Sequence, residues 1–303
     1  MRIATIHVVA LALLLALFAA QATAAQRTRE FPRLGVRVTQ DVEYANVDGT
    51  ALMLDAYEPV TKDRERPVVV YIHGGGWKGG DKNGGARFLI PLVKAGYVGF
   101  SINYRLSGEA HFPAQIYDCK AAIRWVRKHA AEYGGDGMRI GVFGTSAGGH
   151  LVALLGTSNG VAELEGNEGV TGVSSDVQAV CDWFGPSNLA RPGMADNPDG
   201  LVTRLLGAEV KDAPELAAQA SPVTFVDASD PPFLIIHGTK DPLVPFAQSQ
   251  ELRDVLLASG VSVQLIDVPG GKHGGFERTT PNQRELMQAM LAFFDKHIRY
   301  GTG

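Results

Sequence analysis

The sequence predicts an α/β fold whose central sheet is mostly parallel, contains about eight strands and is flanked by helices. Two observations predict it: short β-branched runs alternate along the chain with longer helical patterns, and a hairpin signal precedes them. The chain has 303 residues, of which 45% are hydrophobic, and this is enough to bury a full core. We therefore expect a single domain over residues 38–300.

The first predicted element is a hairpin, because alternating runs at 42–47 and 51–57 flank Asp48-Gly49, a typical two-residue turn. Further strands are predicted over residues 68–72, 98–104, 140–143, 177–183, 233–237 and 261–268. Helices are predicted over residues 86–95, 113–133, 147–156, 246–258 and 282–297. Such alternation is typical of a parallel sheet covered on both faces, with the hairpin adding antiparallel strands at one edge.

One stretch departs from this alternation. Residues 185–230 contain five prolines among short helical pieces. Long connections of this kind in compact domains are often functional, so we expect a small cap insertion over the active site. The alternative is an elaborate connection that makes no contact with substrate.

The N-terminus has the features of an export signal. Arg2 precedes an apolar run over residues 8–20, and Ala22-Thr23-Ala24 follows the small-x-small pattern of a cleavage site. We expect a cleaved signal peptide over residues 1–24 and a loose segment over residues 25–37. The mature protein is then expected to be secreted or periplasmic, without a stable membrane anchor. An uncleaved anchor is the alternative, but the apolar run is shorter than the ~20 residues that a span needs.

Charge and cysteine content bear on partners and redox state. The formal net charge is −4 and the basic residues are scattered, which argues against binding of nucleic acid. The chain has two cysteines, Cys119 and Cys181. In an exported protein they could form one disulfide, and two buried free thiols are an equally good interpretation.

Ser146 lies in a Gly-Thr-Ser-Ala-Gly pattern, residues 144–148, between a predicted strand and a predicted helix. Small residues at both ends of this pattern allow the sharp turn of a nucleophile elbow, which projects the serine hydroxyl from the end of the sheet. Such a serine needs a base to take its proton and a third group to orient that base. Asp241 and His273 follow in the required chain order, each in a loop after a predicted strand, so the sequence predicts these three residues as a catalytic triad.

A glycine run follows an earlier predicted strand. Residues 73–77, His-Gly-Gly-Gly-Trp, can turn backbone N–H groups toward the serine. Acyl transfer creates a negative charge on the carbonyl oxygen, and donors must already be in place to stabilise it. We expect the N–H groups of Gly75, Gly76 and Ala147 to form this oxyanion hole.

These motifs resemble those of the α/β-hydrolase superfamily, within it the hormone-sensitive-lipase-like esterases marked by the His-Gly-Gly-Gly signature, and more narrowly the bacterial carboxylesterase and feruloyl-esterase-like group. The matching stretches are residues 73–82, 118–125, 144–150, 182–186, 237–245 and 271–276. The resemblance implies an α/β-hydrolase fold and hydrolysis of carboxylic esters through an acyl-enzyme, with no metal or cofactor. Ser146 would attack the ester carbonyl, His273 would act as base, and Asp241 would orient His273.

The resemblance implies a small ester substrate or an ester linked to polysaccharide. The candidates for an aromatic rim over the pocket are Trp77, Trp183, Phe184 and Phe112. His150 and His237 lie on apolar elements and are interpreted as structural histidines. Export and the resemblance together suggest acetyl or feruloyl groups of plant polysaccharide, and we expect short acyl groups to be preferred.

Two other functions remain open at this stage. Similar folds carry the same triad in serine peptidases, although those usually have a propeller or another substantial extra domain. A catalytically silent binding protein could also keep the fold. The complete triad and the glycine run argue against the silent protein, because a binding protein needs neither.

Overall fold

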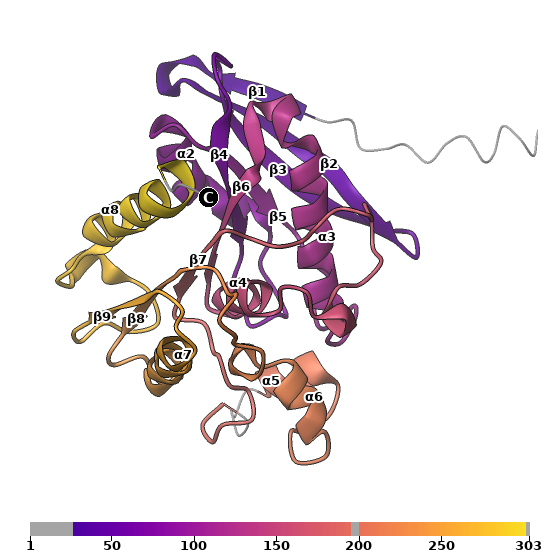
Figure 1. Cartoon of the computed structure of the whole chain (residues 1–303), viewed down its shortest axis with the longest axis vertical. Helices are drawn as coiled ribbons and strands as arrows, with labels where there is room; N and C mark the ends of the chain where they lie inside the picture. Colours follow the sequence, from indigo (N-terminus) through magenta and orange to yellow (C-terminus); the bar gives the residue numbers. More distant parts are fainter. Residues whose placement is uncertain (1–26, 195–199, 301–303) are drawn as a thin grey trace, which may run out of the picture.

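The computed structural model describes residues 27–194 and 200–300, so the predicted signal peptide lies outside the described residues. These residues form one sheet in the order β1-β2-β3-β5-β4-β6-β7-β8-β9 (Figure 1). The strands are β1 (Arg27–Phe31), β2 (Val36–Val47), β3 (Thr50–Pro59), β4 (Arg66–Ile72), β5 (Val98–Ile102), β6 (Gly135–Thr145), β7 (Ala179–Trp183), β8 (Phe233–Gly238) and β9 (Val263–Val268). From β4 onward the strands are parallel to one another, so their carboxyl ends meet at one edge.

Helices cover both faces of this sheet, as predicted. One face carries α2 (Ala86–Lys94) and α8 (Gln283–Phe294), and the other carries α3 (Ala114–His129), α4 (Ala147–Thr157) and α7 (Ala247–Ala258). Figure 1 shows α2 and α8 together on one side of the strands and α3 on the opposite side. Successive side chains of a strand enter opposite cores, so that Val142 of β6 packs on the α3 side and Phe143 on the α2 side.

The predicted hairpin is confirmed. β2 and β3 pair antiparallel, and Asp48 and Gly49 connect them. Both turn residues have positive φ angles, of 50° and 89°, as a type I′ turn requires. This hairpin adds antiparallel strands to the edge of the parallel sheet.

The prediction of a loose segment over residues 25–37 is wrong for the part that the structure describes. Residues 27–31 form β1, which pairs antiparallel with β2 at the edge of the sheet, and a short 3₁₀ turn, Pro32–Leu34, leads into β2. All five residues of β1 are exposed. A strand with no buried face has no hydrophobic alternation, which is the signal that sequence analysis depends on. With β1, the sheet within residues 27–194 and 200–300 has nine strands, where about eight were predicted.

The disulfide that the sequence allowed does not form, because Cys119 and Cys181 are both free and buried. Cys119 on α3 packs into the core on the α3 and α4 face. Cys181 on β7 packs into the core on the α2 and α8 face. The sheet lies between the two thiols and keeps them apart.

The predicted cap, residues 185–230, folds as short pieces. They include α5 (Leu201–Leu206), α6 (Pro214–Gln219) and a 3₁₀ turn at Pro222–Thr224, and residues 195–199 lie outside the described part. Leu205 and Ala217 are fully buried in the same core cluster as α4, so the cap is packed against the domain. Within residues 27–194 and 200–300, no helix is long and apolar enough to cross a membrane.

Candidate active site

Ser146 lies at the sharp turn between β6 and α4, at the edge where the parallel strands end. Its φ of 56° is unusual for a residue with a side chain, and its backbone N–H donates to the carbonyl oxygen of Trp183 at 2.9 Å. Gly148 allows α4 to approach β4 closely, because a Cβ there would lie 2.0 Å from the carbonyl oxygen of Ile72. The local backbone is therefore that of a nucleophile elbow.

The structure brings the three predicted triad residues together. His273 Nε2 lies 2.8 Å from Ser146 Oγ, and His273 Nδ1 lies 2.6 Å from Asp241 Oδ2. A carboxylate can only accept, so Nδ1 carries the proton and Nε2 is free to accept from the serine hydroxyl. This arrangement can activate Ser146 as a nucleophile.

The carboxylate of Asp241 is held by four donors. Its Oδ2 contacts His273 and also His237 Nε2 at 3.1 Å, while its Oδ1 accepts from the backbone N–H groups of Leu243 and Val244. Burial alone would raise the pKa of Asp241, but the hydrogen bonds from His237, His273 and Val244 hold it well below the usual range. Asp241 is therefore ionised and can stabilise a positive charge on His273.

The oxyanion loop, residues 73–82, follows β4 and lies against the elbow. A Cβ at Gly74 would lie 2.5 Å from the carbonyl oxygen of Thr145, so this approach requires glycine. The predicted donors Gly75, Gly76 and Ala147 line the same cavity as Ser146. These three residues thus lie in the wall of the cavity that contains Ser146, as an oxyanion hole formed by their N–H groups requires.

A second segment supports the oxyanion loop from behind. The hydroxyl of Tyr104 donates to the carbonyl oxygen of His73 at 3.0 Å, and the two rings stack with centroids 4.4 Å apart. The N–H of Ser107 donates to the carbonyl oxygen of Trp77 at 2.7 Å. The Asn103 side chain accepts from the N–H of Lys82 at 2.7 Å. Residues 103–107 therefore contact the oxyanion loop at its start, middle and end.

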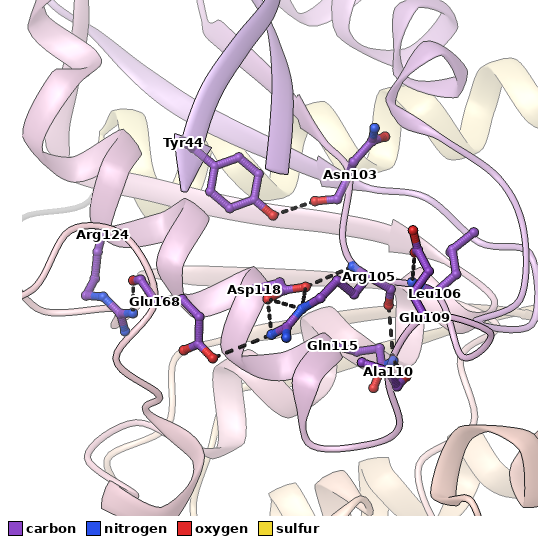
Figure 2. Close-up of polar contacts among 10 residues, drawn as sticks. All are labelled: Tyr44, Asn103, Arg105, Leu106, Glu109, Ala110, Gln115, Asp118, Arg124 and Glu168. Atoms are coloured by element: carbon purple, nitrogen blue, oxygen red, sulfur yellow. Dashed lines mark hydrogen bonds and ion pairs between the residues drawn. The ribbon is translucent and has the colours of Figure 1, made fainter. Parts of the chain in front are cut away.

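The supporting segment is in turn fixed to α3 by a buried ion pair. Arg105 donates to Asp118 from its backbone N–H and its guanidinium, at distances of 2.6 to 3.1 Å. Figure 2 shows the Arg105 guanidinium between Asp118 and Glu168, with Gln115 bonded to the backbone on the other side. Asp118 is fully buried, so the pair connects the core of the domain to the segment behind the site.

The cavity at Ser146 has a volume of about 1120 Å³. Of the four aromatic candidates, Trp77, Trp183 and Phe184 line it. Phe112 does not line the cavity and packs in the α3-side core, so its assignment to the pocket is wrong. Pro186, Met194 and Leu201 of the cap also line the cavity, so the cap contacts the site.

Among the described residues, no group of three His, Cys, Asp or Glu side chains is placed to hold a metal ion.

Two residues of the site were not identified from the sequence. His237, interpreted as structural, also contacts the carboxylate of Asp241, and its position four residues earlier in the chain was the only available signal. The role of Tyr104 depends on the path of residues 103–107 behind the oxyanion loop. No local pattern in the sequence carries that information.

Known proteins with the same features are esterases. Residues 54–256, more than half of the chain, match the BD-FAE family model. The esterase LipQ of Mycobacterium tuberculosis is 33% identical over 264 residues, which cover 84% of this chain and 61% of LipQ. The chain thus spans about three fifths of that relative's length.

Solved structures agree with this assignment. A truncated carbohydrate esterase from gut microbiota is 36% identical with a TM-score of 0.77, over 85% of this chain and 94% of that one. The thermophilic esterase Est2 of Thermogutta terrifontis, solved with bound propionate, is 28% identical with a TM-score of 0.68, over 90% and 93% of the two chains. With the α/β sheet, the elbow and the glycine loop described above, the chain belongs to the BD-FAE family and has an α/β-hydrolase fold.

Proposed function

We propose that this protein is an exported serine esterase that hydrolyses short-acyl carboxylic esters, on small molecules or on acetylated or feruloylated polysaccharide. The observation that carries the proposal is the continuous hydrogen-bonded chain from Ser146 Oγ through His273 to Asp241. Ser146 and His273 of this chain line a cavity that the glycine loop also lines. That combination suits acyl transfer, because the nucleophile, its base and the donors for the oxyanion are all in place.

The proposed reaction has two steps. His273 takes the proton of Ser146 as Oγ attacks the ester carbonyl, and the N–H groups of Gly75, Gly76 and Ala147 stabilise the oxyanion. His273 then gives the proton to the departing alcohol, which leaves an acyl group on Ser146. In the second step His273 takes a proton from water, the hydroxide attacks the acyl group, and the acid is released with the proton returned to Ser146.

The preference for short acyl groups and for carbohydrate esters is supported by relatives. The Thermogutta esterase holds propionate, and the gut esterase is named for carbohydrate esters. Charged residues at the cavity, Lys78, Asp81, Arg87, Glu277 and Arg284, stand beside apolar walls. A polar rim over an apolar interior suits an ester that has a small apolar acyl group and a hydrophilic alcohol.

Hydrolysis of p-nitrophenyl esters from acetate to decanoate, run beside acetylated xylan and methyl ferulate, tests the proposal. We expect the highest kcat/KM between acetate and butyrate, and loss of turnover in Ser146→Ala. A maximum at decanoate would indicate a lipase. If the purified protein cleaves p-nitrophenyl acetate but releases nothing from xylan or methyl ferulate, the polysaccharide part should be dropped.

A fluorophosphonate probe separates the other two functions. We expect labelling of Ser146 in the wild type and none in Ser146→Ala. Absence of labelling in the wild type would favour a catalytically silent binding protein. Labelling with turnover of peptides but not of esters would favour a serine peptidase.

Export is tested independently of catalysis. Cleavage after Ala24 removes Arg2 and the apolar run over residues 8–20. We expect the protein recovered from the periplasm or medium of an expressing bacterium to begin at Ala25. An uncleaved N-terminus in the membrane fraction would favour the anchor.

A further inference from the structure

Trp77, His150 and Ala220 form a buried hydrogen-bonded chain that the proposed reaction does not use. The indole Nε1 of Trp77 lies 3.1 Å from His150 Nδ1, and His150 Nε2 lies 2.7 Å from the carbonyl oxygen of Ala220. The exposed fraction is 2% for Trp77 and zero for the other two. The three residues belong to the oxyanion loop, to α4 one turn after Ser146, and to the end of α6 in the cap.

The chemistry of the three groups fixes the tautomer of His150. An indole N–H can only donate, so Nδ1 of His150 must accept. The ring proton is then on Nε2, where it is donated to the carbonyl of Ala220. Burial lowers the pKa of His150 to about 4, against the opposing effect of the Ala220 bond, so the ring is neutral near pH 7. Each ring nitrogen therefore has the one kind of partner that it needs.

The hydrogen bond between Trp77 and His150 affects the oxyanion loop because Trp77 is part of that loop. Trp77 directly follows Gly76, and its φ of 56° is energetically unfavourable for a residue with a Cβ. Such a backbone persists only where the surroundings hold it. The side chain is held by His150 and the carbonyl by Ser107, so Trp77, the residue directly after Gly76, is fixed from two directions.

The cap reaches the same loop at a second point. A Cβ at Gly76 would lie 3.1 Å from Leu201 Cδ1, which places the α5 side chain against the loop backbone. The bond from His150 to Ala220 adds the end of α6. The oxyanion loop, the nucleophile helix and the cap therefore meet at His150 and Trp77.

We infer that His150 is a positioning residue: by accepting from the Trp77 indole it fixes the oxyanion loop relative to Ser146, and through Ala220 it ties both to the cap. This inference rests on the proposed function, because it concerns the oxyanion of ester hydrolysis. His150 touches neither reacting atom, and its effect is expected in kcat and not in substrate binding.

Two substitutions distinguish the hydrogen-bond acceptor of His150 from the packing of its side chain. His150→Leu keeps most of the volume but removes the acceptor, and His150→Asn places its amide oxygen where Nδ1 stands. With p-nitrophenyl acetate we expect His150→Leu to lower kcat about tenfold to hundredfold, with KM within about twofold. His150→Asn should keep kcat within about threefold of the wild type. The matched control is His129→Leu. The His129 ring also packs on an indole, that of Trp125, with ring centroids 4.6 Å apart, but it lies away from the site.

Indole ¹H–¹⁵N spectra provide a readout that does not depend on activity. The chain has three tryptophans, and Trp77→Phe assigns the Trp77 signal. We expect that signal to move strongly in His150→Leu and little in His150→Asn. Should His150→Leu fail to fold, Trp77→Phe tests the same contact from the donor side and should lower kcat by a similar factor.

The inference is overturned if a folded His150→Leu keeps the wild-type kcat, or if His150→Asn loses as much kcat as His150→Leu. A lower thermal stability with unchanged kcat would likewise reduce His150 to a structural residue. If the wild type hydrolyses no ester and takes no fluorophosphonate, the proposed function fails instead. The Trp77 signal still reports the contact in that case, so the two failures are distinguishable.

Discussion

At the residue scale, two imidazoles share the carboxylate that orients the base. His237 Nε2 lies near both Asp241 Oδ2 and the carbonyl oxygen of Val244, two acceptors, so this nitrogen carries a proton, and Nδ1 pairs with Ser249 Oγ at 2.7 Å. His237 thus contacts the same carboxylate oxygen of Asp241 as His273 does. The catalytic geometry depends on this rigid carboxylate as much as on His273 itself.

Asp241→Asn tests the charge of this carboxylate. We expect kcat to fall about 10³- to 10⁴-fold with the fold intact, because the neutral amide cannot stabilise a positive His273 and, having a single acceptor oxygen, cannot accept from both the imidazoles and the backbone N–H groups. Steady-state kinetics with p-nitrophenyl acetate and the circular dichroism spectrum check it. The matched control is Asp267→Asn on β9, an exposed acid near the same strand end, which should keep full activity. If Asp241→Asn keeps more than a tenth of the wild-type kcat, the assignment of Asp241 to the triad is wrong.

A second buried acid, Asp182, makes a prediction about stability and pH. Its Oδ1 accepts from the N–H of Gly185, its Oδ2 has no hydrogen-bond partner among the residues that the structure describes, and burial raises its pKa to about 6. Between pH 4 and 6 the folded state therefore binds more protons than the unfolded state, so this group's contribution to stability falls as pH rises. Relative to Asp182→Asn, the wild type should lose about 2–3 kcal/mol of unfolding free energy from pH 4 to 7.

Urea unfolding of both proteins at several pH values measures this difference. The amide of the Asp182→Asn variant keeps an acceptor for Gly185 but has no charge to bury. The unfolding free energy of this variant should therefore not fall between pH 4 and 7 for this reason. The exposed Asp212→Asn serves as control and should follow the wild type. Parallel profiles for the wild type and Asp182→Asn would contradict the prediction.

At the scale of elements, the oxyanion loop depends on a segment that never reaches the cavity. Residues 103–107 contact it at three points, and Arg105 with Asp118 joins that segment to α3. A glycine-rich loop has little intrinsic rigidity, since glycine loses the most backbone freedom on folding. The precision of the oxyanion hole therefore comes from neighbouring elements.

Tyr104→Phe is a small change that tests this support. It removes only the hydroxyl that donates to His73 and keeps the ring stacked on the imidazole. The freed carbonyl of His73 is buried, and we expect kcat to fall about three- to tenfold with little change in KM. Kinetics on the acetate ester measure the effect. Tyr300→Phe, on an exposed ring, is the matched control. Equal kcat values for the two variants would show that the bond does not position the loop.

Elements whose signals are local could be predicted from the sequence. The order of Ser146, Asp241 and His273 and the strand before each could be predicted, because chain order and β-branched runs are visible without coordinates. Contacts between distant segments could not be predicted. Tyr104 and His73, or Trp77 and His150, are brought together only by the topology of the sheet.

At the scale of the whole molecule, the sheet divides the interior into two separate cores. Alternate residues of each strand serve one core or the other, and a helix belongs to the core of the face that it covers. Two buried side chains can therefore lie on opposite faces of the sheet and be separated by its full thickness. The sequence left the disulfide and two free thiols as equal alternatives for this reason, because the side of the sheet on which each cysteine lies is known only once the strand order is known.

The two cores yield a final prediction about the thiols. Burial raises the pKa of both Cys119 and Cys181 well above the usual range, so neither forms a reactive thiolate in the folded protein. We expect almost no reaction of the native protein with a thiol reagent, and two thiols per chain after denaturation without reductant. Cys181→Ser should release one. Fewer than two thiols from the denatured wild type would mean that the cysteines are oxidised. A disulfide between Cys119 and Cys181 would contradict the strand order or the placement of α3.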